Sequence, residues 1–255
     1  MDPIAPSQAG AGAAPRELLP PVEGVSLWWC GLERTPAELA VIARTLSTAE
    51  TARAARFGTD ALRHRWMAGR AALRQVLAMT LGVAPSEVAL RRGVRGRPQL
   101  ADGNAHLDFN VSHTRDVALM AIAHEAAPAT RIGVDIEHTE RGVGVDRLEK
   151  KFLAPRERER ISGLSPDMRR RQFLHYWTCK EAMSKATGDG IIAPFRQLDV
   201  ELGDPPRLLA GPPPYVPENW SLHRAALPPE WFATVAIWHG TGSNGATARV
   251  TARTS

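Results

Sequence analysis

The stretch around residue 135 constrains the fold of this chain more than any other part of the sequence. Residues 133–137 read Gly-Val-Asp-Ile-Glu, with apolar and acidic residues in alternation. In a β-strand successive side chains face opposite ways, so Asp135 and Glu137 point to the same side about 7 Å apart. Val134 and Ile136 then point to the other side, into a core. The pattern predicts a strand with one apolar face and one acidic face.

A second stretch predicts the element that faces these carboxylates. Residues 177–185 read Trp-Thr-Cys-Lys-Glu-Ala-Met-Ser-Lys. In a helix Trp177, Glu181 and Lys185 recur every four residues and share a face. If this helix packs near the acidic strand, three carboxylates and two lysines (Lys180 and Lys185) meet in one place. Such a set suits a hard divalent cation, which prefers oxygen ligands, and a phosphorylated substrate. Taken singly, each stretch is equally compatible with an exposed strand face or a helix surface covered by salt bridges.

Helix and strand signals alternate along the 255 residues and predict an α+β fold of two similar halves. Each half has one long helix packed on a small, mainly antiparallel sheet, and a ligand cleft is expected between the halves. The first long helix is expected to be capped by Asp60 and to end at Gly82, the second to start at Ser165-Pro166 and to stop at Gly188. A proline-rich loop is expected at 205–217. The predicted division is a disordered segment 1–23, an N-terminal half 24–128, a C-terminal half 129–240 with the metal site, and a disordered tail 241–255.

Charge and cysteine content narrow the classes of protein. The net charge is +5, and ten arginines but only two carboxylates lie between Arg53 and Arg97. Such a surface favours a phosphate-bearing ligand, nucleic acid or an acidic protein, although solvated helix faces have the same composition. Cys30 and Cys179 are isolated, as expected in a reducing cytoplasm. No apolar run reaches membrane-spanning length and no secretory signal is recognisable, so a cytoplasmic location is expected.

Two further segments carry polar groups of lower specificity. A predicted strand ends in Ser112 and His113, which can bind phosphate or carry protons, although such a histidine is often only a turn residue. The turn at 93–98, Gly-Val-Arg-Gly-Arg-Pro, offers flexible backbone and two guanidinium groups. It lacks the spacing of a nucleotide-binding P-loop.

Taken in order, these segments resemble the 4′-phosphopantetheinyl transferases of the Sfp type. The resemblance covers roughly residues 25–240. It rests most on Asp135-Ile-Glu137 and on Trp-x-x-Lys-Glu-x-x-x-Lys about 40 residues later. Further matching segments are the Arg-Phe pair that ends at Phe57, Gly96-Arg97-Pro98, Phe109-Asn-Val-Ser-His113 and Gly188-Asp-Gly190.

The resemblance implies a reaction and a set of roles. The 4′-phosphopantetheine arm of coenzyme A is transferred to a serine of an apo carrier protein, and adenosine 3′,5′-bisphosphate is released. Asp135, Glu137 and Glu181 match the Mg²⁺ ligands, with Mn²⁺ as a substitute. Glu181 is also the expected general base, acting directly or through water, with Lys185 and His113 as the other catalytic groups. The expected coenzyme A contacts are Arg53 and Arg65 at the 3′-phosphate, Arg97 at the nucleotide, and Ser112, His113, Lys180 and Lys185 at the phosphates.

The resemblance leaves the carrier open among fatty acid, polyketide, nonribosomal peptide and lysine-type synthesis, with secondary metabolism favoured. Carrier proteins are typically acidic around the modified serine, which suits a basic enzyme. A monomer is expected, with no nucleic acid or membrane partner. Two other functions stay open: a Mg²⁺-dependent nuclease, and a non-catalytic basic module that binds an acidic protein or RNA.

Overall fold

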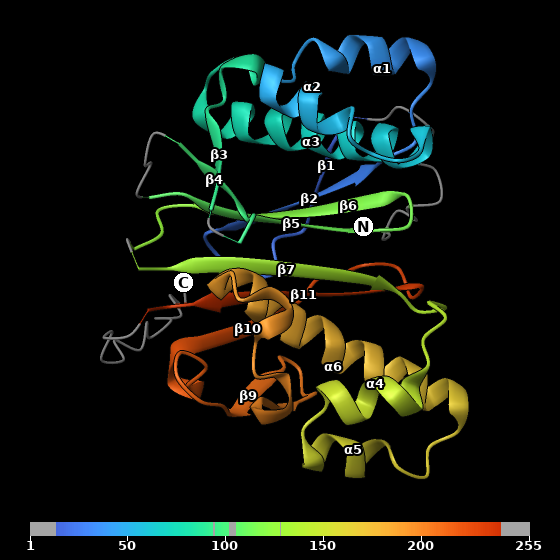
Figure 1. Ribbon diagram of the computed structural model, residues 1–255. Coiled ribbons are helices and arrows are strands. Elements are labelled where there is room, and N and C mark those ends of the chain that lie inside the picture. The colour runs from blue at the N-terminus through green and yellow to red at the C-terminus, as the bar shows by residue number, and fades with distance from the viewer. Residues whose placement is uncertain (1–13, 94, 102–105, 128, 241–255) are drawn as a thin grey trace, which may run out of the picture.

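Two helices of 22 residues, α3 (Asp60–Leu81) and α6 (Pro166–Thr187), organise the molecule. The computed structural model describes residues 14–93, 95–101, 106–127 and 129–240. Each long helix lies on its own antiparallel sheet, α3 in the N-terminal half and α6 in the C-terminal half (Figure 1). Both helices end at a glycine in the left-handed conformation, Gly82 and Gly188, as predicted. The predicted α+β fold of two similar halves is confirmed.

The N-terminal half contains a four-stranded sheet covered by α3, and two shorter helices pack on α3 (Figure 1). Helices α1 (Pro36–Ala43) and α2 (Thr48–Ala54) each begin with a capping box, in which a hydroxyl and a glutamate satisfy the first backbone amides. The sheet order is β1-β2-β6-β5, and β3 and β4 form a separate hairpin. The strands are β1 (Arg16–Leu18), β2 (Val25–Gly31), β3 (Leu90–Arg92), β4 (Pro98–Leu100), β5 (Asp108–Thr114) and β6 (Val117–Ala123).

The C-terminal half contains a three-stranded sheet of order β10-β11-β7 and a small hairpin of β8 and β9. Two short helices, α4 (Val145–Phe152) and α5 (Pro155–Ile161), precede α6. The helical conformation is interrupted between them before Pro155, which begins α5. The strands are β7 (Arg131–His138), β8 (Asp199–Glu201), β9 (Arg207–Ala210), β10 (Trp220–Arg224) and β11 (Trp231–Trp238).

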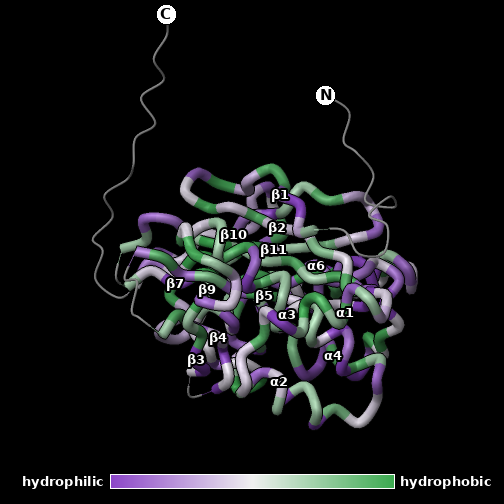
Figure 2. Tube along the Cα trace, turned by 90° about the horizontal axis from the view of Figure 1, so that it is seen from above, coloured by the Kyte–Doolittle hydropathy of each residue, from purple (hydrophilic) through white to green (hydrophobic). Residues whose placement is uncertain are grey.

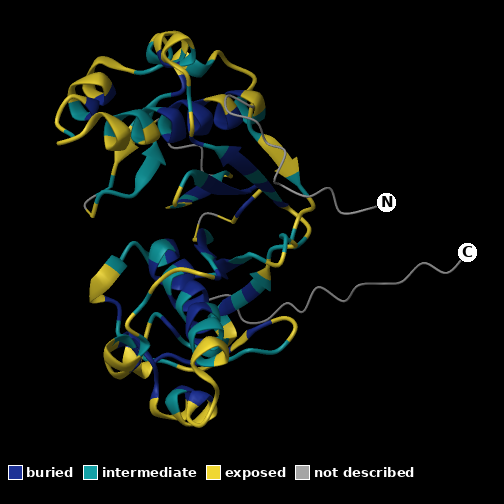
Figure 3. Cartoon of the chain, turned by 90° about the vertical axis from the view of Figure 1, so that its right-hand side faces the viewer, coloured by how far each residue is buried: buried dark blue, intermediate teal, exposed yellow. Residues whose placement is uncertain are grey.

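The elements stack in four layers, helices, sheet, sheet and helix, from top to bottom in Figure 1. Residues of β2 and β6 share a core with residues of β7 and β11, so the two sheets pack face to face. Their outer faces pack against α3 and α6 in two further cores. Seen from above, β2 and β11 overlap in projection, in agreement with stacked sheets (Figure 2). Buried residues line the inner faces of both halves, and exposed residues lie on the outer helices (Figure 3).

Three sequence-based expectations are wrong. The segment predicted to be disordered up to residue 23 contains strand β1, which pairs antiparallel with β2 and so satisfies its edge. Thr59, and not Asp60, caps α3, because the Thr59 hydroxyl accepts the Leu62 amide at 3.3 Å. The predicted loop 205–217 contains strand β9. The predicted disordered residues 1–13 and 241–255 lie outside the described residues, as does residue 128 at the predicted boundary between the halves.

In the part of the chain that the structure describes, none of the helices combines the length and the apolar character that crossing a bilayer requires.

Candidate active site

Strand β7 presents the acidic residues as its sequence predicts. Val134 and Ile136 lie in the core between the two sheets. Asp135 and Glu137 point to the other side of the strand, and their residues are only 4% and 5% exposed. A carboxylate buried to this extent needs a cation or several hydrogen bonds, because burial otherwise favours its neutral form.

Asp135 finds its partners on both halves of the molecule. The Lys185 Nζ on α6 is 2.6 Å from Asp135 Oδ1. The Ser112 hydroxyl on β5 donates to the same oxygen at 2.8 Å and accepts from Lys185 Nζ at 2.8 Å. Three elements that are distant in sequence therefore meet in one hydrogen-bonded cluster. This cluster unites three of the residues that the sequence analysis proposed.

The second oxygen of Asp135 marks the position that a cation would take. Asp135 Oδ2 is buried and makes no hydrogen bond within the described residues. Burial, followed by the negative charge of Asp135, raises the pKa of Glu181, while Lys185 and Arg141 oppose this rise. Glu181 and Asp135 are thus close enough to repel each other. An unsatisfied carboxylate oxygen beside a second carboxylate fits the ligand preferences of a hard divalent cation.

Glu137 is engaged elsewhere. It accepts a hydrogen bond from Thr114 at 3.2 Å and forms an ion pair with Arg141. Across the described ranges, no three His, Cys, Asp or Glu side chains gather closely enough to hold a metal by themselves. Lys185 and Arg141 are thus the ion-pair partners of Asp135 and Glu137 in this structure, and the three-carboxylate metal site stays a prediction. Arg141 follows β7 in a turn, and no sequence signal singled it out.

His113 lies one residue beyond Ser112 on β5; the residue is exposed, but its ring lies against α3 at Gly69. Desolvation of the ring, followed by the positive charges of Lys185 and Arg70, lowers its pKa to about 4. The imidazole is therefore neutral near pH 7. Its Nε2 atom lies only 2.9 Å from the point where a Cβ on Gly69 would stand. The glycine in α3 thus provides the space that the ring occupies.

The predicted arginines are dispersed around the cleft. Arg53 lies over the Trp66 ring at 5.6 Å and lines a pocket with Arg56, Phe57 and Arg92. Arg65 forms an ion pair with Asp116 at 2.8 Å, and both side chains are largely exposed. Arg65, the other arginine expected at the 3′-phosphate, is not among the residues that line this pocket. Arg56 and Arg92, which no sequence pattern singled out, line the pocket together with Arg53.

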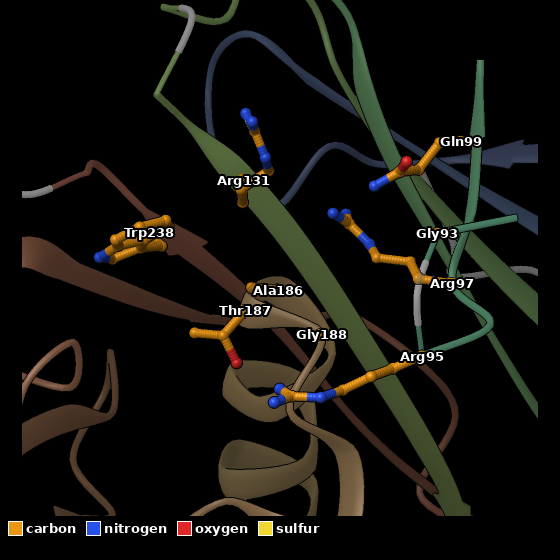
Figure 4. A pocket seen from close by; sticks show the side chains of 9 residues that line it. All are labelled: Gly93, Arg95, Arg97, Gln99, Arg131, Ala186, Thr187, Gly188 and Trp238. Atoms are coloured by element: carbon orange, nitrogen blue, oxygen red, sulfur yellow. The ribbon is translucent and has the colours of Figure 1, made fainter. Parts of the chain in front are cut away.

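A pocket of about 310 Å³ is lined by residues of both halves (Figure 4). The β3–β4 hairpin contributes Arg95 and Arg97, and α6 contributes its last turn. Arg95 forms an ion pair with Asp189 just beyond α6. Arg97 donates from Nη2 to Asp108 at 2.8 Å and to the Ile132 carbonyl at 2.7 Å. This end of the cleft is thus closed by contacts between the halves, and Nη2 of Arg97 takes part in them, whereas its Nε has no hydrogen-bond partner among the described residues.

Comparison with known proteins identifies the family. Residues 131–235 match the model of the 4′-phosphopantetheinyl transferase superfamily, and residues 32–125 match the model of a 4′-phosphopantetheinyl transferase N-terminal region. The 4′-phosphopantetheinyl transferase HetI of Nostoc sp. is 37% identical over 217 residues, which are 84% of this chain and 87% of the relative.

The chain belongs to the 4′-phosphopantetheinyl transferase family. A phosphopantetheinyl transferase of Thraustochytrium sp. is 32% identical over 203 residues, 73% of this chain and 68% of the relative. The human L-aminoadipate-semialdehyde dehydrogenase-phosphopantetheinyl transferase is 28% identical over 197 residues, 72% of this chain and 62% of the relative. Of the functions that the sequence leaves open, these matches support the transferase, and the protein is an enzyme of this kind.

The position of Lys180 in this transferase corrects one expected role. Its side chain is fully buried, with Nζ 2.5 Å from the equally buried Glu157. Nζ also donates to the carbonyls of Phe152 at 2.9 Å and Phe195 at 2.7 Å. All three protons of the ammonium group are thereby used. Lys180 is not accessible to a phosphate or a carrier protein, because it points into the core of the C-terminal half.

Proposed function

We propose that this transferase moves the 4′-phosphopantetheine arm of coenzyme A to a serine of an apo carrier protein. The serine oxygen forms a bond to the phosphorus that carries the pantetheine, and the bond from that phosphorus to the bridging oxygen breaks. Adenosine 3′,5′-bisphosphate leaves, and the serine proton passes to a base of the enzyme. Positioning and charge neutralisation are expected to supply most of the acceleration.

The observation that carries the proposal is the cluster of Ser112, Asp135 and Lys185 beside Glu181. It joins groups from both halves, and buried carboxylates and a lysine meet in it. Asp135 and Glu181 would hold Mg²⁺ or Mn²⁺, with Glu137 joining them if Arg141 moves away. Bound there, the cation would neutralise charge on the pyrophosphate of coenzyme A.

The side chains of the site divide the remaining work. Glu181 is the expected base, and its raised pKa makes it a better proton acceptor than an ordinary glutamate. Lys185 neutralises the leaving phosphate and can supply it with a proton. Ser112 and His113 donate hydrogen bonds to the phosphates, His113 as a neutral imidazole in the free enzyme.

The outer contacts follow from charge. Arg53, Arg65 and Arg97 are proposed to face the nucleotide and its 3′-phosphate, with Arg53 best placed because it lines a pocket with two further arginines. An acidic carrier protein of fatty acid, polyketide or nonribosomal peptide synthesis suits the basic chain. We place the enzyme in the cytoplasm as a monomer, in keeping with its two unpaired buried cysteines.

The test is intact-protein mass spectrometry of an apo carrier protein incubated with the enzyme, coenzyme A and Mg²⁺. We expect a mass gain of one phosphopantetheine arm that is lost with EDTA. Glu181→Ala should lower the rate about 10²- to 10⁴-fold, the usual contribution of a general base. Glu159→Ala, the same change at an exposed residue of α5, is the control. The absence of a mass gain with several unrelated carriers and with either Mg²⁺ or Mn²⁺ would refute the proposal.

As the pH falls, cation binding is expected to weaken at a higher pH than it would at a site whose glutamate has an ordinary pKa. The pKa of Glu181 is raised, so a proton competes with the cation for this carboxylate earlier as the pH falls. Titration with Mn²⁺, followed by electron paramagnetic resonance from about pH 8 to pH 5, measures this dependence. Glu181→Gln should bind Mn²⁺ more weakly and with a flatter pH profile. An equal pH dependence in both proteins would show that Glu181 is not the group concerned.

The replacement Gly69→Ala is expected to displace the His113 ring without unfolding α3. The new Cβ would stand 2.9 Å from His113 Nε2, whereas alanine itself favours a helix over glycine. The KM for coenzyme A should rise about tenfold, since small misplacements of substrate-binding groups are costly. In a His113→Ala background the same change should add nothing. A further loss in that background would mean that Gly69 acts through another residue.

A further inference from the structure

The two halves meet along β5 and β7, which run side by side in the middle of Figure 1. Each is the last strand of its sheet. β5 pairs with β6, and β7 pairs with β11. The backbone amides on the free edge of β7 therefore need acceptors other than a neighbouring strand of its own sheet.

Side chains of β5 supply these acceptors. Asp108 Oδ2 accepts the Ile132 amide at 2.7 Å, and Asn110 Oδ1 accepts the Val134 amide at 3.1 Å. Ser112 Oγ accepts the Ile136 amide at 3.3 Å. Every second residue of β5 thus bonds to every second residue of β7, always 24 positions further along the chain. We call these three hydrogen bonds the seam ladder.

The two outer rungs have additional tasks. Asp108 is also the ion-pair partner of Arg97 at 2.8 Å. Ser112 is also bonded to Asp135 and Lys185 of the active site. Asn110 differs from both, because among the described residues the one hydrogen bond of its side chain is that to Val134. It is buried, with 4% of the residue exposed. Among the described residues its side chain makes no hydrogen bond to any group proposed to act on substrate.

We infer that Asn110 is a positioning residue: as the middle rung of the seam ladder it holds β7 in the register that brings Asp135 to Ser112 and Lys185. This inference rests on the proposed function for its catalytic consequence. Asp135 follows Val134 directly, so the rung at Val134 fixes the backbone at the carboxylate. Side chains face alternate ways along a strand, so even a small shift of β7 along β5 would separate Ser112 from Asp135.

The first test uses hydrogen–deuterium exchange of the unmodified protein. The amides of Ile132, Val134 and Ile136 should be as well protected as the amides of β7 that pair with β11. Fast exchange at these three amides, of the kind expected for an open sheet edge, would overturn the inference. This measurement needs neither substrate nor metal, so its failure is distinct from failure of the proposed function.

The second test compares variants. Asn110→Ala should accelerate exchange across 132–136, weaken Mn²⁺ binding about tenfold and lower kcat with little change in KM. Asn110→Ser places a serine hydroxyl at the middle rung, the same group that accepts the Ile136 amide at Ser112. It should therefore restore most of these properties.

Trp220→Phe is the control. It removes the hydrogen bond that Nε1 of the buried Trp220 donates to the Pro214 carbonyl at 3.0 Å. Trp220 lies on β10, which β11 separates from β7 and the seam ladder. The change is expected to lower the melting temperature without changing Mn²⁺ affinity. If Asn110→Ala lowers only the melting temperature, as Trp220→Phe does, or if Asn110→Ser restores nothing, Asn110 has a merely structural role and the inference is wrong.

Discussion

Replacing Gly133 by alanine is expected to destabilise the transferase by about 3 kcal/mol or more, the upper range for inserting atoms into a packed core. Gly133 lies on β7, where the strand packs directly against α6. A Cβ there would stand 1.9 Å from the Ala182 carbonyl oxygen and 2.6 Å from the Ala186 nitrogen. Both are backbone atoms, so no side-chain rotation relieves the clash. The helix must move away from the strand that carries Asp135.

Urea denaturation measures the loss of stability, and Mn²⁺ titration measures the damage to the site. Gly142→Ala is the control, since a Cβ at Gly142 would meet nothing within 4 Å. We expect the control to keep both properties. If Gly133→Ala unfolds at the same urea concentration as Gly142→Ala, the close approach of α6 to β7 is not present in solution.

The second large effect is expected for Lys180→Met, which should cost about 3–5 kcal/mol because it leaves the buried Glu157 carboxylate without its partner. Burial lowers the pKa of Lys180 and raises that of Glu157, and their mutual attraction opposes both shifts. Glu157 also accepts the amides of Ala154 and Val200 at 2.7 and 2.9 Å. The pair therefore ties α6 to α5 and β8.

Chemical denaturation of three proteins tests this role. Lys180→Met should unfold far more easily than Lys150→Met, which changes an exposed lysine of α4. The double variant Lys180→Met, Glu157→Leu should recover much of the stability, since it removes both charges. A Lys180→Met enzyme that keeps its stability but loses affinity for coenzyme A would instead support the phosphate contact that the sequence resemblance implied.

Much of the local structure is predictable because it depends on residues a few positions apart. The alternation at 133–137 correctly places Val134 and Ile136 in the core and the two carboxylates on the opposite face. Helix starts are equally local: the capping boxes of α1 and α2 need only a hydroxyl and a glutamate three residues later. The same reasoning failed at α3, where two adjacent residues can both cap and only the backbone angles decide between them.

The residues of the candidate site are predictable only in part. Residue type and position on a strand or a helix suffice to select Ser112, Asp135 and Lys185, which meet in the structure. The ion pair of Glu137 with Arg141 is not predictable, because it depends on the path of the turn after β7. The seam ladder also escapes prediction, since nothing in the sequence around Asn110 indicates which strand of the other half lies beside it.

The sequence by itself determined the family, the faces of β7 and α6, and the residue types of the proposed site for a cation and phosphates. Tertiary structure alone decided which of two lysines reaches Asp135. Lys180 and Lys185 are five positions apart on α6, about 140° around the helix axis. Only the packing of α6 on β7, with β5 alongside, directs Lys185 to Asp135 and Lys180 into the core.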